Sequence, residues 1–383
     1  MKKSIRFALL AGAVLASLAF AGAAFASFAP KLVVSSATPQ GSGGPTRVGV
    51  VISNSDDPTA AVSIYIPSGF QVGAPAAGTK LGDVTATASA ADLGGAVLPL
   101  TGELDAVPAT TATNTAAAQC GVTPSQTWDL HLTAAGQTLD IPMFVVAGAA
   151  PEVALGYQTK LVVCLPPPDV PAGTPGRATF GAKLLSATFT SSAITQPSTS
   201  GDFRWTSLWT PYNPGKGTPN KAGSVEVQSI RHLPTAVSLK VTKKKLTTIK
   251  KIKGKKVKRK KVTTVVRWSA TATANSAAPS SSTVATVIAG TLASGKKTGG
   301  ASGSFVLAAG KSATITSTAT INSDTGSIPT GQPANAAGDL WYHDLGSGAC
   351  TPTTALTGGL PCINATVGGD ILKATAKVTG YKK

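Results

Sequence analysis

The sequence is poor in the residues from which active sites are usually built. Its three histidines, His131, His232 and His343, lie far apart, and the patterns G-x-S-x-G and H-E-x-x-H of common hydrolases are missing. An apparent phosphate loop at residues 290–297 carries Lys297 where Ser or Thr must hold magnesium, so it is interpreted as an ordinary loop. We therefore expect no enzymatic activity, no metal and no cofactor.

Long amphipathic helical patterns are also missing, which excludes a mainly helical fold. Short runs of β-forming residues recur instead, such as RVGVVISN, TWDLHLTA and KLVVCLP, and Gly, Pro, Asn or Asp interrupts them. Strands of this length and spacing predict an all-β protein built from antiparallel sandwiches. In TWDLHLTA, His131 alternates with Leu130 and Leu132, so we expect its side chain to point outward from the sheet.

The start of the chain has the features of an export signal. Residues 1–6 are basic, residues 7–25 are apolar, and Ala24-Phe25-Ala26 supplies small residues for signal peptidase. An uncleaved membrane anchor is the competing interpretation, because the apolar run is nearly long enough to cross a bilayer. Cleavage is favoured, which makes 1–26 a signal peptide and leaves no transmembrane segment. We expect a secreted or cell-envelope protein outside the plasma membrane.

The chain has four cysteines and no C-x-x-C pair, which disfavours redox catalysis and a zinc knuckle. Disulfides persist in the oxidising surroundings that an exported protein meets. Four cysteines allow three pairings. Proximity in sequence, together with the domain division given next, favours Cys120 with Cys164 and Cys350 with Cys362.

The chain length predicts about two domains. We expect β-sandwiches at 27–233, with long loops, and at 234–383; a further division of the first near Pro166-Pro167-Pro168 stays open. The two halves share Asn-Ser-Asp turns at 54–56 and 322–324 and A-G turns near Gly136 and Gly310, and one strand of the first half ends in P-x-G at 67–69. With these motifs the chain resembles bacterial extracellular immunoglobulin-like tandem-domain proteins. The resemblance implies two immunoglobulin-like sandwiches and speaks for fold, not for activity.

One aromatic segment allows two interpretations. In FRWTSLWTPY, Phe203, Trp205, Ser207 and Trp209 share one face of a strand. If exposed, Trp205 and Trp209 would suit stacking on carbohydrate, as in a carbohydrate-binding module. Because aromatic residues are only 5% of the chain, we favour burial in a core.

The strongest signal is an uneven distribution of charge. The formal net charge is +18, and loss of Lys2, Lys3 and Arg6 with the signal peptide leaves +15. Residues 240–268 hold fourteen basic side chains and no acidic one, so the rest of the mature chain carries only +1. A localised charge of this size sets a local electrostatic potential, whereas a dispersed charge mostly confers solubility.

The same segment predicts a long β-hairpin. Thr-Thr pairs at 247–248 and 263–264 flank Gly254 almost symmetrically, so we expect the chain to turn there. Leu246, Ile249 and Ile252 are spaced by three, which no flat strand can place on one face. Lysines are also expected to face lysines across the ladder, an unfavourable pairing. The hairpin base should be firm and its tip should project.

Two uses of the hairpin are weighed evenly, since edge lysines also prevent aggregation between sheets. The first hypothesis is a secreted non-enzymatic binding or structural protein whose hairpin contacts anionic cell-wall polymers or lipid head groups. Nucleic acid would bind equally well on charge alone, but an exported protein meets envelope polymers first. The alternatives are the carbohydrate module and a purely structural extracellular protein without a ligand. The candidate polyanion-binding residues are Lys243, Lys244, Lys245, Lys250, Lys251, Lys253, Lys255, Lys256, Lys258, Arg259, Lys260 and Lys261.

Overall fold

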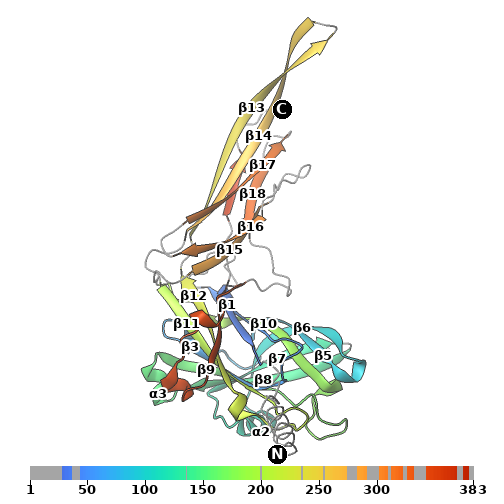
Figure 1. Cartoon of the computed structure of the whole chain (residues 1–383), viewed down its shortest axis with the longest axis vertical. Helices are drawn as coiled ribbons and strands as arrows, with labels where there is room; N and C mark the ends of the chain where they lie inside the picture. Colours follow the sequence, from blue (N-terminus) through green and yellow to red (C-terminus); the bar gives the residue numbers. More distant parts are fainter. Residues whose placement is uncertain are drawn as a thin grey trace, which may run out of the picture.

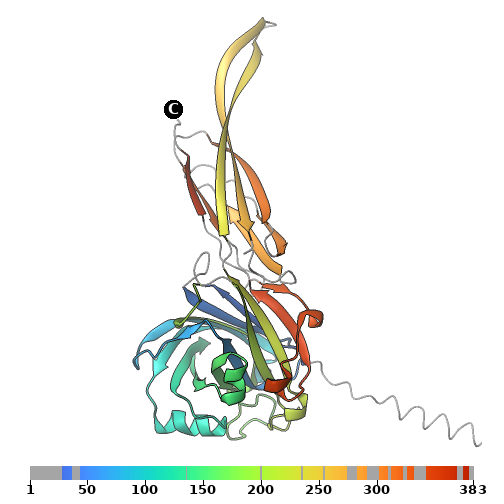
Figure 2. The ribbon, with the colours of Figure 1, turned by 90° about the vertical axis from the view of Figure 1, so that its left-hand side faces the viewer.

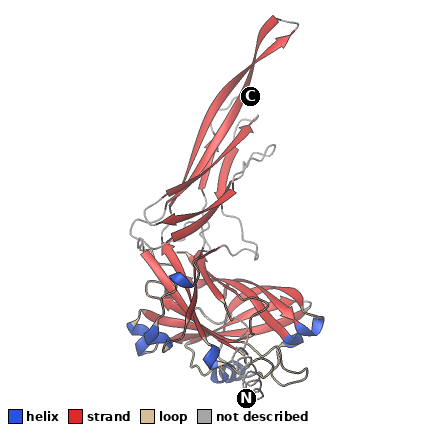
Figure 3. Ribbon diagram, in the orientation of Figure 1, coloured by secondary structure: helices blue, strands red, loops and turns tan. Residues whose placement is uncertain are grey.

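Strands dominate the structure. The computed structural model describes residues 28–36, 44–134, 136–198, 201–233, 236–252, 255–273, 283–290, 302–308, 312–321, 326–331, 342–368 and 374–378, and between 232 and 343 it describes strands and their pairing only. The helices in these ranges are short (Figure 3), which confirms the all-β prediction. The expected signal peptide, 1–26, lies outside the described residues. The helical segments are η1 (Ala91–Leu93), α2 (Thr111–Gln119), α3 (Ala150–Ala154), η2 (Thr179–Gly181), η3 (Lys221–Gly223), η4 (Ser347–Ala349) and α4 (Thr354–Thr357).

The largest sheet has fourteen strands and holds the buried core. Its strands are hydrogen-bonded in the order β1-β2-β10-β5-β6-β7-β8-β9-β3-β11-β12-β20-β19, and β4 pairs with β10. These strands are β1 (Lys31–Ser36), β2 (Pro45–Val51), β3 (Thr59–Pro67), β4 (Gln71–Val72), β5 (Lys80–Ala90), β6 (Ala96–Val107), β7 (Gln126–Ala134), β8 (Gln137–Ala147), β9 (Tyr157–Cys164), β10 (Ala182–Thr195), β11 (Gly201–Pro211), β12 (Val225–Leu233), β19 (Tyr342–Asp344) and β20 (Cys362–Gly368).

Alternation of side chains explains how these strands build the core. In β7, Trp128, Leu130 and Leu132 are buried, while His131 and Thr133, which alternate with them, are exposed. Successive residues of a strand point to opposite faces, so every second side chain enters the core. The outward orientation predicted for His131 is confirmed.

The large sheet curls until its two ends approach each other (Figure 2). The backbone N–H of Val34 in β1 donates to Ser229 Oγ in β12 over 2.9 Å. Thr366 Oγ1 in β20 donates to the carbonyl oxygen of Leu32. Gly368 lies so close to the Val34 carbonyl that a Cβ atom would overlap it, so only glycine fits there. Side chains and one glycine therefore connect the ends of a nearly closed, barrel-like sheet.

Two immunoglobulin-like sandwiches are not confirmed by this arrangement. Strands β5 to β9 follow one another along the chain, and each pairs with the next within a single sheet. An immunoglobulin sandwich instead needs connections that pass from one sheet to the other. Because the connections here keep successive strands adjacent, the pairing continues and the natural twist of the sheet curls it.

The large sheet takes strands from both sides of residue 233. After the strands of 27–233 come β19 and β20, and β20 pairs in parallel with β12 from Glu226↔Cys362 to Ile230↔Val367. The division at 233–234 therefore stays a prediction, and the segment 342–368 belongs to the same sheet as the residues that precede it.

Seven further strands form two smaller sheets (Figure 1). One has the order β13-β14-β17 and the other β16-β15-β18-β21. Their bounds are β13 (Ala236–Ile252), β14 (Lys255–Thr273), β15 (Thr283–Gly290), β16 (Ser302–Ala308), β17 (Ser312–Ile321), β18 (Gly326–Gly331) and β21 (Ala374–Val378). Contacts between β13 and β21 and between β16 and β17 bring the two sheets together.

Both disulfides have the expected pairing. Cys120 at the end of α2 is bonded to Cys164 in β9, with 6.0 Å between their Cα atoms. Cys350 is bonded to Cys362 in β20, with 5.6 Å between their Cα atoms. Each bridge holds a helical turn against the large sheet. Within the described ranges, no helix has the length and apolar character needed to cross a bilayer.

Candidate functional site

The predicted basic hairpin is formed by β13 and β14. These strands pair antiparallel from Ala236↔Thr273 to Ile252↔Lys255, so the chain reverses between 252 and 255, as predicted. Lys253 and Gly254 themselves lie outside the described residues. At the tip, Lys251 is in register with Lys256, which agrees with the expectation that lysine positions would face each other across the ladder.

A third strand pairs with only part of the hairpin. β17 pairs with β14 from Thr264↔Ile321 to Thr273↔Ser312, and Thr264 is in register with Lys245 of β13. Among the described strands, residues 246–252 and 255–263 therefore pair with each other alone. We call this two-stranded part the lysine ribbon. It extends beyond the three-stranded sheet, at the end of the molecule farthest from the large sheet (Figure 1).

The candidate residues divide between the two parts of the hairpin. Lys243, Lys244 and Lys245 are in register with Val266, Val265 and Thr264, alongside β17. The other described candidates belong to the lysine ribbon: Lys250, Lys251, Lys255, Lys256, Lys258, Arg259, Lys260 and Lys261.

The irregular apolar spacing at the tip has a structural counterpart. The register shifts between Thr248 and Lys250, which leaves Ile249 of β13 and residues 258–260 of β14 without partner residues. Such a bulge interrupts the ladder and increases the local twist. The spacing by three of Leu246, Ile249 and Ile252, which no flat strand could accommodate, coincides with this bulge.

Trp205 and Trp209, the alternative carbohydrate-stacking pair, are both fully buried. Trp205 packs edge-on against Phe70, with ring centroids 4.9 Å apart, and Trp209 Nε1 donates to Ser207 Oγ over 2.8 Å. A ring without accessible surface cannot stack on a sugar. The proposed stacking role is therefore wrong for this structure, and the favoured interpretation of a buried aromatic core is confirmed.

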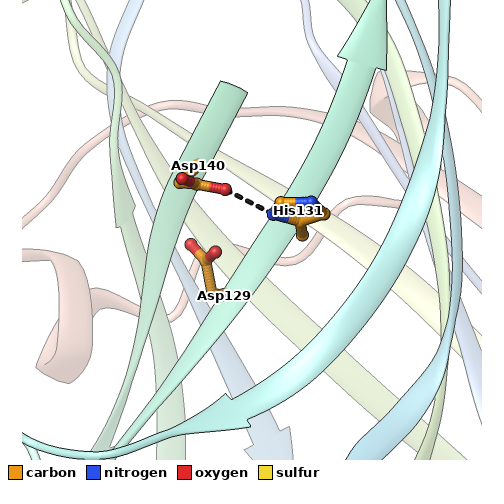
Figure 4. Close-up of side chains that lie close together, drawn as sticks. All are labelled: Asp129, His131 and Asp140. Carbon is orange, nitrogen blue, oxygen red and sulfur yellow. Dashed lines mark hydrogen bonds and ion pairs between the residues drawn. The ribbon is translucent and has the colours of Figure 1, made fainter. Parts of the chain in front are cut away.

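A cluster that sequence reasoning missed lies on the outer face of the large sheet (Figure 4). Asp129 and His131 alternate on β7, and the register places Asp140 of β8 opposite His131. His131 Nδ1 and Asp140 Oδ1 are 2.6 Å apart, a hydrogen bond. One ligand atom from each of the three side chains lies within 4.8 Å of the others.

Electrostatics in this cluster act mainly on Asp129. Partial burial, followed by repulsion from the Asp140 carboxylate, raises the pKa of Asp129 from 3.8 to about 6. Asp105, opposite Asp129 on β6, adds to the rise, and His131 opposes it. Burial is therefore the main cause of the raised pKa, and the neighbouring carboxylates add to it.

The cluster provides three ligand types that divalent metals accept. However, His131 and Asp140 are 51% and 61% exposed, and they already satisfy each other by a hydrogen bond. Surface carboxylates commonly form such groups, so this geometry alone does not define a metal centre. We assign it an electrostatic effect on stability and no ligand.

No protein-family model matches the chain, and the curated proteins contain no match to it.

Proposed function

We propose that this protein is an exported, non-enzymatic binding or structural protein whose lysine ribbon makes electrostatic contact with anionic polymers or lipid head groups of a cell envelope. The observation that carries the proposal is the strand register. Residues 246–252 and 255–263 pair only with each other among the described strands, and they hold eight of the described basic positions. A two-stranded ribbon beyond the sheet can approach an extended anionic surface without interference from the rest of the molecule.

Export is part of the proposal, and two observations support it. The first 26 residues have the composition of a signal peptide. All four cysteines are paired in disulfides, the state that oxidising compartments maintain.

The strength of such a contact can be gauged from the charge. If about half of the fourteen charges met an anionic membrane at ~1 kcal/mol each, the gross attraction would be ~7 kcal/mol. That free energy corresponds to affinity in roughly the micromolar range and falls steeply as salt is added. Nucleic acid could compete on charge alone. An exported protein meets envelope polyanions first.

The finer architecture also belongs to the proposal. Strands β13 to β18, together with β21, form antiparallel sheets of three and four strands that contact each other. Seven strands in two such sheets is the composition of a constant-type immunoglobulin sandwich. This count supports an immunoglobulin-like arrangement for that part of the chain.

The test is retention of the mature protein on isolated cell envelopes. In the first variant, the eight ribbon residues Lys250, Lys251, Lys255, Lys256, Lys258, Arg259, Lys260 and Lys261 are replaced by glutamine. In the matched control the seven lysines become arginine, which keeps the charge. We expect the glutamine variant to lose retention at least tenfold at low salt, the arginine control to keep it, and about 0.5 M NaCl to release the wild type.

Equal retention of the glutamine variant and the wild type would refute the proposal. Thermal unfolding of the large sheet, followed by tryptophan fluorescence, should be the same in all three proteins. Retention on vesicles of anionic phospholipid, compared with teichoic-type polymers, then separates the two kinds of polyanion.

A further inference from the structure

The interior of the large sheet is incompletely filled. Three adjoining cavities, of about 80, 60 and 50 Å³, lie in the region enclosed by β5, β7, β8 and β10. A buried water needs about 10–15 Å³ of such space, so each cavity exceeds the packing defects usual in a core. A fourteen-stranded sheet curled on itself encloses more volume than short side chains can fill.

The cavities form a row. Ala86, Leu132 and Leu184 line both the 60 Å³ and the 80 Å³ cavity. Ala88 and Ala182 line both the 80 Å³ and the 50 Å³ cavity. The shared lining residues place the three cavities next to one another in a row inside the sheet.

Alanine residues leave the space along this row of cavities unfilled. The inward positions of β5 run Val84, Ala86 and Ala88, and all three are buried. On the neighbouring strand β10, Ala182 and Ala187 also line the cavities. Larger aliphatic residues at these positions would fill the space, as leucine and isoleucine do elsewhere in the same core.

Polarity changes along the row. The innermost cavity, next to Trp209 and Met143, has Thr59 as its sole polar lining residue. The outermost is lined by Gln137, Thr138 and Thr179 in addition to apolar residues. An apolar cavity stays dry and takes up apolar molecules, whereas uncharged polar groups at its mouth can hydrogen-bond to a head group.

Phe180 marks the mouth of the outermost cavity. It belongs to η2, is 38% exposed and lines this cavity directly. Leu93 of η1 is 46% exposed, and η1 contacts η2. Exposed hydrophobic side chains at and next to an apolar cavity indicate an entrance.

The backbone at the entrance is strained and fixed. Phe180 has a φ of 54°, the one positive value among the described non-glycine residues. Bulky residues rarely adopt this conformation, which is found at ligand-binding sites when the surrounding structure enforces it. Just before η2, the Arg177 guanidinium donates two hydrogen bonds of 2.7 Å to Asp92 of η1 and a third, from Nε, to the Val170 carbonyl oxygen, which fixes this segment against η1.

From this combination we propose that the large sheet binds the acyl chain of a fatty acid or lipid. The chain would lie along the row of cavities with its head group at Gln137, Thr138 and Thr179. Three small cavities in line suit a thin, flexible hydrocarbon and exclude a bulky ring system. The inference is independent of the lysine ribbon, because the cavities and the ribbon belong to different sheets.

The test uses cis-parinaric acid, a fluorescent fatty acid, with the full mature chain in about 0.5 M NaCl, where electrostatic attraction to lysines is largely screened. We expect saturable binding to the wild type. The double variant Ala86→Leu/Ala88→Leu fills the row and should bind at least tenfold more weakly. Ala118→Leu, on the exposed face of α2, adds the same side chain away from the cavities and should bind as the wild type does.

Two further measurements keep the test decisive if the double variant fails to fold. Ala182→Val fills less space and should weaken binding by about threefold to tenfold, and Phe180→Ala should do so by removing the aromatic ring at the entrance.

Displacement by palmitic acid but not by lysophospholipid identifies a free fatty acid as the ligand, and the reverse identifies a lipid. No saturable binding to the wild type, or equal binding to Ala182→Val and Ala118→Leu, would overturn the inference. The glutamine ribbon variant should bind the fatty acid normally.

Discussion

The large sheet and the lysine ribbon differ in how their charged side chains are compensated. Residues 27–233 carry ten basic and twelve acidic side chains, and fully buried members such as Glu226 and Arg231 are hydrogen-bonded. The ribbon has basic residues without an acidic one, and its pairing brings lysine positions together. One region is stabilised by burial of apolar surface. The other holds charge whose mutual repulsion opposes its own folding, which is reasonable only where the charge serves a contact or solubility.

The sharpest test of this contrast is truncation of a tryptophan. Trp209 is fully buried, so Trp209→Ala should lower the free energy of unfolding by about 3–5 kcal/mol. Replacing the eight ribbon residues by glutamine should not lower it, because the change removes repulsion between like charges. Urea unfolding followed by circular dichroism measures both. If the ribbon variant lost as much unfolding free energy as Trp209→Ala, the proposed contrast between the two regions would be wrong.

A second test concerns buried polar groups. Glu226 accepts hydrogen bonds from Gln228 Nε2, at 2.6 Å, and from the Thr353 backbone N–H and hydroxyl, at 2.9 and 2.8 Å. Glu226→Ala removes the acceptor that these donors share and should cost about 2–3 kcal/mol. Limited proteolysis should then cut near Thr353 first. Glu226→Gln keeps an acceptor oxygen and should cost less, so equal losses in the two variants would contradict the hydrogen-bond explanation.

Among the single substitutions, the smallest effect is expected at Asp129, and it has the opposite sign. Because the folded protein raises the Asp129 pKa from 3.8 to about 6, it binds this proton more tightly than the unfolded chain does. Stability should therefore fall as the pH rises from about 4 to about 6 and then stay level. The full shift would be worth ~3 kcal/mol, but the group is half exposed and solvent screens it, so ~1 kcal/mol is expected.

Asp129→Asn removes this penalty. At pH 7 the variant should be more stable than the wild type by ~1 kcal/mol, and at pH 4 the two should be equal. Thermal unfolding in the presence of EDTA measures the difference without interference from divalent cations. A variant that is less stable at pH 7 would show that the carboxylate makes a favourable interaction instead.

Local features of the fold were predictable from the sequence, and distant ones were not. The alternation in TWDLHLTA shows which side chains are buried, and proximity identifies the partners of Cys120 and Cys350. The antiparallel hairpin on either side of Gly254 was also predictable. Alternation states which face a residue occupies but not which strand lies beside it. The insertion of β10 between β2 and β5, and the parallel pairing of β12 with β20, therefore could not be predicted.

The cluster on the outer face was within reach of sequence reasoning. A turn at Gly136 pairs Ala134 with Gln137, and counting back along the hairpin places His131 opposite Asp140. The row of cavities could not be predicted from the sequence, because it depends on which alanine residues face one another after the sheet has curled.

The chain passes between the large sheet and the smaller sheets three times. It leaves after β12, returns before β19, and leaves again after β20 to reach β21, which pairs with β18. Three covalent connections would therefore share any pulling force applied to the ribbon. A single proteolytic cut in one connection would leave the two regions joined by the other two.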